Sequence, residues 1–379
     1  MDTLLHEIRQ EWKDHILPFW LRLKDEAHGG FYGEVDVDLH IHTKADKGGI
    51  ATARLLWSFS AAARVTGERI YKDAARHAFL FLQQHLIDPV YGGMYWMADH
   101  TGRPDDTCKH VYAQATGDPD ALPLAKELFH LLEQKGYDRT RQAYGEQFDR
   151  MWNIQPNELL SENGVTAYIT MNTHIHVLEA YTQLLRVWPD KSVRDALANV
   201  LDILYSRVYD ASARRLGVFF DSDWRSLLDL TSYGHDIEAS WLIEEAMNVL
   251  GHHPPEYVEM VVDISHAVAE RAVQPDGSLI NEREGDRVDT SRIWWVQAEG
   301  IVGFYNAYQR TQDERFLQIV RDLWAYTRQY IVDPRPGGEW FWSVQADGKP
   351  DPKEVAGPWK CPYHNSRFCI EMLERTGTK

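Results

Sequence analysis

A short segment that combines glycine with aromatic residues recurs along the chain and sets the strongest limit on its fold. The six segments are GGFYGEV (29–35), GGMYWMA (92–98), YGEQFDR (144–150), LGVFFDS (216–222), DGSLINE (276–282) and GGEWFWS (337–343). One glycine from each, at 29, 92, 145, 217, 277 and 337, gives steps of 63, 53, 72, 60 and 60 residues. A regular period of this size is typical of repeat architectures. The glycine turns and alternating bulky residues predict a small β-hairpin or a tight extended loop in each repeat.

Between successive segments lie two helix-period stretches that are separated by a short polar turn. After the first segment the turn TGE separates ATARLLWSFSAAARV from RIYKDAARHAFLFLQQHL, and after the fifth TQDE separates IWWVQAEGIVGFYNAYQR from RFLQIVRDLWAYTRQYI. Apolar residues at i, i+3, i+4 and i+7 predict helices. The first helix of each pair is richer in Ala, Gly and aromatic residues, whereas the second has a charged face, as expected of an outer helix.

The two ends of the chain complete this pattern. Amphipathic helices are predicted from Leu4 to about Leu21 and from Pro362 to about Leu373, and each supplies the partner that the other lacks. A closed ring of six helical pairs, an (α/α)6 barrel, explains this arrangement better than an open array, which would need polar capping repeats. Because no linker interrupts the repeats, residues 1–379 are predicted to form one domain, although length alone suggests two or three.

One repeat is shorter than the others. Lys47 and Thr66 in the first repeat are 19 positions apart, as are Arg292 and Thr311 in the fifth, whereas the equivalent span in the second repeat, 109–116, covers only 7. About 12 residues, or roughly three turns, are therefore missing from one inner helix. We expect this truncated helix near 109–116 to be either a tolerated local change or a deletion that opens the barrel wall.

Composition excludes several classes of protein. Lys and Arg number 40 against 57 Asp and Glu, so the net charge of −17 argues against a nucleic-acid partner, which requires a basic surface. Three cysteines cannot form a disulfide framework, and no apolar run approaches the ~18 residues of a membrane span. The N-terminal residues MDTLLHEIRQEW lack the apolar region of a signal peptide. We therefore expect a soluble, cytoplasmic protein that is a monomer or a weak homodimer.

Polar and aromatic residues recur near the starts of the predicted inner helices, about one repeat apart. They are Arg54, Lys109, His110, Asn172, His176, His235, Glu238, Arg292, Trp294, Trp295, His364 and Arg367. Equivalent residues of successive repeats lie around the same rim of a barrel, where helix N-termini add partial positive charge. The set predicts a basic, histidine-rich pocket with aromatic walls, in which tryptophan could stack on a sugar.

Each of these residues also has a more ordinary interpretation. His176 lies in an apolar helical stretch and suits a core position, and Trp294 and Trp295 could simply pack. His235 is the better candidate because Glu238 follows it by one helical turn and could fix its tautomer.

Carboxylates and cysteines could support other chemistry. The candidate hydrogen-bond partners, or alternatively an acid–base pair, are Glu158, Glu162, Glu238 and Glu299. Cys361 and His364 have C-x-x-H spacing but lack convincing further zinc ligands, so no metal site is expected. Phosphate-binding and dinucleotide-binding glycine motifs are missing as well, so no cofactor is expected.

Long segments of the chain resemble the N-acylglucosamine 2-epimerase family and, within it, the cellobiose 2-epimerases. These segments include ADKGGIATARLLWSFSAA, YGGMYWMADHTGRPDDTCKH, SENGVTAYITMNTHIHVLEAY, SYGHDIEASWL, RIWWVQAEGIVGFYNAY and VAGPWKCPYHNSR. The resemblance runs from Glu7 to about Leu373 and departs from the family after KHVYAQ, where relatives continue a full Ala-rich helix. It implies an (α/α)6 barrel and an isomerase that inverts C2 of the reducing-end glucose of β-1,4-linked disaccharides, as in cellobiose or lactose.

The resemblance also implies roles for individual residues. The implied catalytic residues are the histidine pair His235 and His364, a third histidine His176, the arginine Arg54 and the histidine-orienting Glu238. The expected substrate contacts are Asn172, Trp359, one of Trp294 and Trp295, Tyr112 and Glu299.

The implied reaction suits two histidines. After the sugar ring opens, the C1 carbonyl acidifies the C2 proton, and inversion requires that a proton leave one face and return to the other. Two groups with a pKa near neutrality can do this, and an arginine can stabilise the enediolate oxygen. The alternatives are an aldose–ketose isomerase or another sugar 2-epimerase, a glycoside hydrolase that uses two carboxylates, and an inactive sugar-binding protein.

Overall fold

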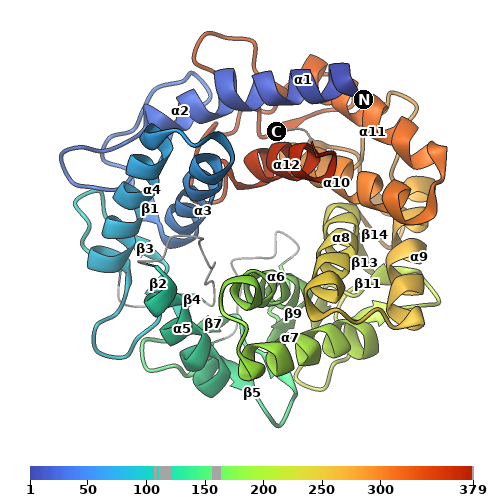
Figure 1. Ribbon diagram of the computed structural model, residues 1–379, viewed down its shortest axis with the longest axis horizontal. Helices are drawn as coiled ribbons and strands as arrows, with labels where there is room; N and C mark the ends of the chain where they lie inside the picture. Colours follow the sequence, from blue (N-terminus) through green and yellow to red (C-terminus); the bar gives the residue numbers. More distant parts are fainter. Residues whose placement is uncertain (106–108, 111–120, 156–163, 378–379) are drawn as a thin grey trace.

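The helices form two concentric rings (Figure 1). The computed structural model describes residues 1–105, 109–110, 121–155 and 164–377. Within these ranges the inner ring contains α3 (Gly49–Thr66), α6 (Met171–Val187), α8 (Tyr233–Leu250), α10 (Trp294–Thr311) and α12 (Tyr363–Arg375). The outer ring contains α4 (Arg69–Phe81), α5 (Leu122–Leu131), α7 (Lys191–Ile203), α9 (Pro255–Arg271), α11 (Glu314–Tyr326), and α1 (Asp2–Gln10), which continues through a π-helical stretch (Glu11–Ile16) into α2 (Leu17–Leu21). This arrangement is the predicted (α/α)6 barrel.

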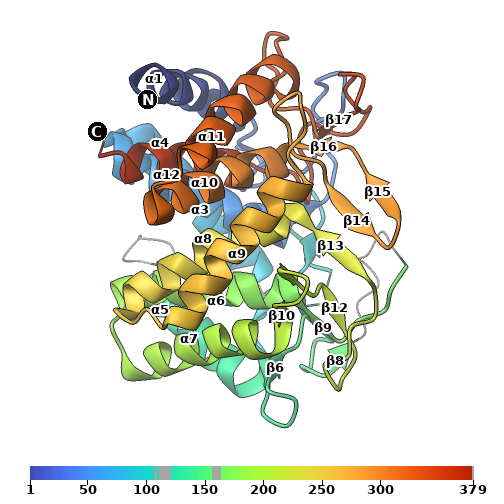
Figure 2. The ribbon, with the colours of Figure 1, turned by 90° about the vertical axis from the view of Figure 1, so that its right-hand side faces the viewer.

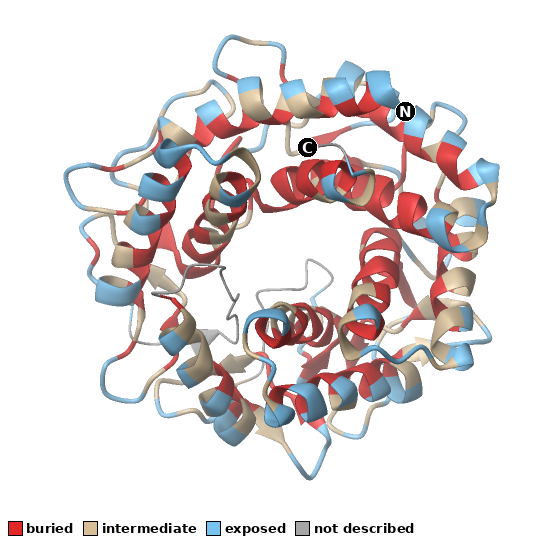
Figure 3. Cartoon of the chain, in the orientation of Figure 1, coloured by how far each residue is buried: buried red, intermediate tan, exposed pale blue. Residues whose placement is uncertain are grey.

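Inner and outer helices differ in burial, as their composition predicts. α8 and α10 are buried around most of their circumference, whereas outer helices such as α4 and α11 bury one face (Figure 3). Small residues let the inner helices approach closely: a Cβ atom on Gly303 of α10 would lie 2.6 Å from the carbonyl oxygen of Ile237 on α8. No helix in the described ranges combines the length and apolar composition that crossing a membrane requires.

The ends of the chain complete the ring. α12 packs against α1, α3 and α10, so the C-terminal inner helix has the N-terminal helix as its outer partner. Two indoles reinforce this closure, since Trp324 Nε1 donates to Glu7 at 3.0 Å and Trp340 Nε1 donates to Glu11 at 2.8 Å. The predicted pairing of the two terminal helices is therefore correct.

Short strands join each helical pair at one end of the barrel. The antiparallel partners are β1 (Lys47–Gly48) with β3 (Met97–Ala98), β9 (Ile169–Thr170) with β12 (Phe219–Phe220), β13 (Leu230–Ser232) with β14 (Glu282–Glu284), β16 (Arg292–Ile293) with β17 (Ser343–Val344), and β14 with β15 (Arg287–Asp289). Local hairpins also form, between β5 (Tyr137–Asp138) and β6 (Ala143–Tyr144) and between β10 (Tyr209–Asp210) and β11 (Arg215–Leu216). The glycine–aromatic segments are thus extended, as predicted, but several pair with the strand that precedes an inner helix rather than with a local neighbour.

The predicted truncated helix near 109–116 falls almost entirely outside the described residues. Within the described ranges, no helix stands in the inner ring between α3 and α6 (Figure 1). The two described residues of this stretch form β4 (Lys109–His110), which pairs with β2 (Met94–Tyr95) and with β7 (Gln147–Phe148), and β7 also pairs with β8 (Ile154–Gln155). Between α3 and α6, the described part of the inner ring therefore consists of these short strands.

Candidate active site

The inner helices begin around a cavity of about 690 Å³. Nine predicted site residues line it: Arg54, Asn172, His176, His235, Glu238, Trp294, Trp295, Trp359 and His364. Glu299 was predicted to contact the substrate, but it is fully buried, does not line the cavity and contacts His364 instead. Tyr112, Glu158 and Glu162, and the side chains of Lys109 and His110, lie outside the described part of the chain.

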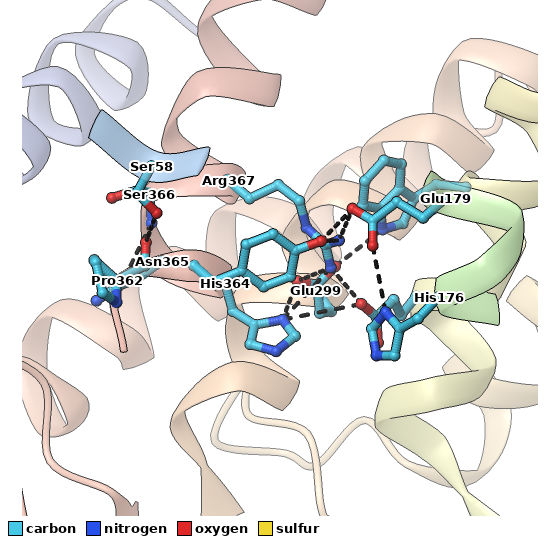
Figure 4. A network of polar contacts seen from close by, with 12 residues as sticks. Ser58, His176, Glu179, Glu299, Pro362, His364, Asn365, Ser366 and Arg367 are labelled. Atoms are coloured by element: carbon cyan, nitrogen blue, oxygen red, sulfur yellow. Dashed lines mark hydrogen bonds and ion pairs between the residues drawn. The ribbon is translucent and has the colours of Figure 1, made fainter. Parts of the chain in front are cut away.

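Arg367 is the centre of a buried ion network beneath the cavity (Figure 4). Its Nη1 donates to Glu179 Oε1 at 2.6 Å, and its Nη2 donates to Glu299 Oε1 at 2.7 Å and also to Glu238. These carboxylates belong to α6, α10 and α8, so one guanidinium on α12 connects four inner helices. Burial opposes its charge, but the surrounding carboxylates hold the pKa of Arg367 well above its usual value.

His364 rests directly on this network. Its Nδ1 lies 2.7 Å from Glu299 Oε1, and Glu299 Oε2 accepts a hydrogen bond from Trp241 Nε1 at 3.0 Å. Although burial raises the pKa of Glu299, arginine and indole can only donate, so Glu299 acts as an acceptor and His364 carries its proton on Nδ1. Nε2 then keeps its lone pair. Burial holds the pKa of His364 well below its usual value, which keeps the imidazole neutral.

His235 has a neutral support instead. Its Nδ1 lies 2.7 Å from the hydroxyl of Ser232, the residue that precedes α8. Because a hydroxyl can donate or accept, this contact leaves both tautomers of the imidazole available. Burial lowers the pKa of His235 to about 4, so this ring is also neutral at pH 7.

The indole of Trp295 contacts both histidines. Its ring centre lies 4.7 Å from that of His235 and 5.5 Å from that of His364. Gly234 makes this packing possible, because a Cβ atom at that position would lie 2.6 Å from the Trp295 ring. Trp294, in contrast, is only 1% exposed and has the Lys360 ammonium 4.4 Å from its ring centre. Trp295 is therefore the more accessible of the two indoles.

The third histidine is joined to the same ion network. His176 Nδ1 lies 3.3 Å from Glu179 Oε2, whose other oxygen accepts from Arg367. His176 lines the cavity, so the pocket position predicted for it is favoured over the core position. Arg54 also lines the cavity and places its guanidinium carbon 4.7 Å from the ring centre of Tyr363, whose hydroxyl accepts from Arg367 at 2.5 Å.

The prediction that Glu238 fixes the tautomer of His235 is wrong. Glu238 Oε1 instead accepts from Arg367 and lies 3.9 Å from His364 Nδ1, while Ser232 takes the position beside His235. The physical reason is that a charge-assisted bond to arginine is stronger than one to a neutral imidazole. The other carboxylate oxygen of Glu238 is buried without a hydrogen-bond partner in a side chain that lines the cavity.

The prediction of a basic pocket is also wrong. Among the described lining residues, the cations Arg54 and Lys353 face four carboxylates, those of Glu238, Glu282, Asp289 and Asp351. Three of these carboxylates belong to strands and loops rather than to helix starts, which is why the helix-start pattern missed them. Arg292, which that pattern did include, is turned away from the cavity and donates to Ser278 Oγ at 3.0 Å. The predicted histidines and aromatic walls are present.

In the described ranges, one group of side chains is close enough to ligate a metal ion, and the Arg367 guanidinium already supplies positive charge there. Ligand atoms of Glu238, Glu299 and His364 lie within 4.8 Å of one another. Arg367 Nη2 donates to both carboxylates, so its guanidinium balances their charge there.

The supporting residues that sequence reasoning missed or left without a role are Ser232, Glu179 and Arg367. Each is three residues from the histidine that it supports: Glu179 follows His176, Arg367 follows His364, and Ser232 precedes His235. Residues three apart share one face of a helix, so a search for polar residues at this spacing would have found Glu179 and Arg367. Ser232 instead ends β13, and helical spacing from His235 leads to Glu238, which pairs with Arg367. The rim residues Asn281, Asp289, Trp342 and Lys353 follow no such pattern.

Comparison with known proteins identifies relatives over almost the whole chain. Residues 30–367 match the N-acylglucosamine 2-epimerase family. The cellobiose 2-epimerase of Ruminococcus albus is 44% identical, over 98% of this chain and 99% of that protein. That alignment has 387 positions, more than the 379 residues of this chain, so the relative has residues that this chain lacks.

Solved structures agree with the sequence comparison. The cellobiose 2-epimerase of Bacillus thermoamylovorans is 51% identical and superimposes with a TM-score of 0.96, over 99% of this chain and all of that one. A D-mannose isomerase superimposes with a TM-score of 0.85 over 99% of this chain and 98% of its own, at 18% identity, and so shares the fold.

Proposed function

Because the chain belongs to the N-acylglucosamine 2-epimerase family, we propose that it inverts C2 of the reducing-end glucose of β-1,4-linked disaccharides. The substrates would include cellobiose, converted to glucosylmannose, and lactose, converted to epilactose. The observation that carries this proposal is the pair of neutral imidazoles, His235 and His364, that contact one indole in one cavity. A cavity of about 690 Å³ falls within the usual range for small-molecule sites, roughly 300–1,000 Å³.

Aromatic side chains hold the sugar in this proposal. Trp295 supplies the stacking surface beside the two histidines, and its greater accessibility supports it over Trp294 in this role. Trp359 provides a second surface and is itself supported by Trp96, with ring centres 5.1 Å apart. Asn172 lines the same cavity and supplies hydrogen bonds to hydroxyls.

The two histidines transfer the proton. Once the ring has opened, the neutral imidazole on one face of C2 accepts the C2 proton and becomes an imidazolium, leaving an enediolate. That imidazolium releases its proton to water, and the imidazole on the other face takes up a proton from water and donates it to C2. Both rings are neutral again at the end, and the reverse reaction exchanges the two roles. One of the pair also assists ring opening. Arg54 stabilises the negative oxygen of the enediolate.

The buried network positions His364 for this step. Glu299 accepts a hydrogen bond from Nδ1 of His364, so Nε2 is the nitrogen that faces the substrate. When His364 becomes an imidazolium, this carboxylate stabilises its charge. Glu299 and Glu238 are thus positioning residues. Both carboxylates accept a hydrogen bond from the same Arg367 nitrogen, Nη2, and so do not stand apart on either side of a scissile bond, which argues against the hydrolase alternative.

We extend the proposal to the setting in which the reaction occurs. Residues 1–379 act as one catalytic domain, in the cytoplasm, as a monomer or weak homodimer and without a cofactor. His176, joined to the network through Glu179, completes the set of active-site histidines.

One experiment tests the proposed reaction. The protein is incubated with cellobiose in D₂O and the products are followed by NMR. We expect a mannose-configured reducing end that carries deuterium at C2. A ketose product would indicate an aldose–ketose isomerase, free glucose a hydrolase, and unchanged cellobiose without isotope exchange a binding protein; each of these results would overturn the proposal.

A further inference from the structure

A second cavity, of about 220 Å³, is lined by residues of β11, β13, β14 and the end of α9. Figure 2 shows β13 and β14 beside α9. We refer to it as the arginine cavity. Its lining residues are Arg215, Arg271, Arg283, Asp229, Thr231 and Tyr233, together with Ala213 and Gly285. Three guanidinium groups against one carboxylate give this lining a net positive charge, whereas the chain as a whole carries −17.

Strand alternation separates the arginine cavity from the cavity of about 690 Å³ at the candidate active site, which we call the sugar cavity. On β13, Thr231 faces the arginine cavity and Ser232 faces the sugar cavity. On β14, Arg283 and Glu282 alternate in the same way, and Arg283 is the direct cross-strand partner of Thr231. Successive side chains of a strand point to opposite faces, so one small sheet forms a wall of both cavities.

Two of the three arginines lack a close carboxylate. Arg215 is paired, donating to Asp229 at 2.5 Å and to Thr231 Oγ1 at 2.7 Å. Arg283 donates to the Gly285 carbonyl at 2.7 Å, and its nearest carboxylate oxygen is 3.8 Å away on a fully exposed residue. Arg271 donates to the Ala213 carbonyl at 2.6 Å and has no carboxylate oxygen within 4.0 Å among the described residues. An anion placed between these groups would therefore relieve uncompensated charge.

The three arginines share the cavity lining with one buried phenol. Tyr233, the first residue of α8, is 3% exposed, and burial raises its pKa while Arg283, Arg271 and Arg215 each act to lower it. Asp236, the nearby acid on the same helix, does not fully neutralise them, because burial raises its pKa to about 7. The cavity thus combines three cations with a tyrosine in its lining.

We propose that the arginine cavity binds a phosphate dianion, either free or as the phosphate group of a small phosphorylated molecule. The charge of the lining matches a dianion, and the forked donors of arginine suit phosphate oxygens. The volume is smaller than the roughly 300 Å³ at which typical small-molecule pockets begin, so a second disaccharide is not the expected ligand. The site is independent of the reaction proposed above.

Calorimetric titration of the full chain with inorganic phosphate tests this proposal. The titration is done at constant ionic strength, with and without saturating cellobiose. The test variant is Arg271→Gln/Arg283→Gln, and the matched control is Arg69→Gln/Arg315→Gln, which removes the same charge from side chains that are 91% and 77% exposed. We expect saturable binding by the wild type in both conditions, weakened at least about tenfold in the test variant and unchanged in the control.

Other results would overturn the proposal. These are no saturable binding of phosphate or sugar phosphate up to about 10 mM, equal loss of binding in both double variants, or binding that saturating cellobiose abolishes. If the double variant does not fold, Arg283→Gln alone replaces it, since that side chain is half exposed and its one close hydrogen bond is to a carbonyl. Glucose 6-phosphate distinguishes the sources: binding about tenfold tighter than phosphate indicates an organic phosphate, and equal binding indicates the free ion.

Discussion

His364 and His235 face the same cavity but rest on different supports. His364 belongs to a buried charged region in which Glu299 and Arg367 determine where its proton lies. His235 belongs to a neutral region at the β13–α8 junction, where the Ser232 hydroxyl leaves either tautomer available. Two histidines that must exchange roles between forward and reverse reactions are therefore not equivalent: one is oriented by charge and the other by a group that can adapt.

Removing Arg367 should have the largest effect on the charged region. Arg367→Met leaves three buried carboxylates, those of Glu179, Glu238 and Glu299, without their shared cation. Breaking a buried ion network in this way typically costs about 3–5 kcal/mol. Urea unfolding should show a loss of this size. A loss below about 1 kcal/mol, typical of a surface pair, would contradict the central role given to this guanidinium.

Replacing Glu299 tests the same region without removing its cation. Glu299→Gln keeps the shape but weakens the acceptor for His364 Nδ1, so a larger share of the imidazole adopts the wrong tautomer. Loss of the partner that orients a metal-binding histidine costs roughly 10–100-fold, and we expect a loss of similar size here. Steady-state kinetics should show this loss in kcat rather than in KM, because Glu299 does not line the cavity. A change confined to KM would instead place Glu299 against the substrate.

Acid should destabilise the protein partly through His235. Its pKa is about 4 in the folded state against 6.5 for the free side chain, so between these values the unfolded chain binds more protons and stability falls as pH falls. Asp236, with a folded pKa of about 7, acts in the opposite direction. The measurement is therefore the Tm of wild type minus the Tm of His235→Asn, which should decrease from pH 7 to pH 5. A value that stays constant or increases would contradict neutral burial of this ring.

The smallest effect is expected in the neutral region. Ser232→Ala removes the hydroxyl beside His235 Nδ1 but leaves no charge unpaired, so kcat should fall by less than about tenfold. Measured beside Glu299→Gln, this variant shows directly which support matters more. A loss as large as that of Glu299→Gln would mean that the two histidines are oriented with equal force.

The fold could be predicted from the sequence because it repeats. A period near 60 residues determines the ring, and the same period places Arg54, His176, His235 and His364 at equivalent helix starts. Contacts between repeats could not be predicted in the same way. His364 and Glu299 are 65 residues apart, and their contact depends on how α10 and α12 pack. The carboxylates on β14 and β15 reach the cavity through strand pairing, which the helical pattern does not contain.

The central claim is that His235 and His364 act on opposite faces of C2, and isotope exchange in single variants tests it most directly. His235→Asn and His364→Asn are each incubated in D₂O with cellobiose and, separately, with glucosylmannose. Each variant should lose inversion by about 10²–10⁴-fold, as expected when a general acid–base group is removed. The remaining histidine should still exchange the C2 hydrogen of one epimer only, and the two variants should select opposite epimers. Inversion by either variant at close to the wild-type rate, or exchange of the same epimer by both, would contradict the account.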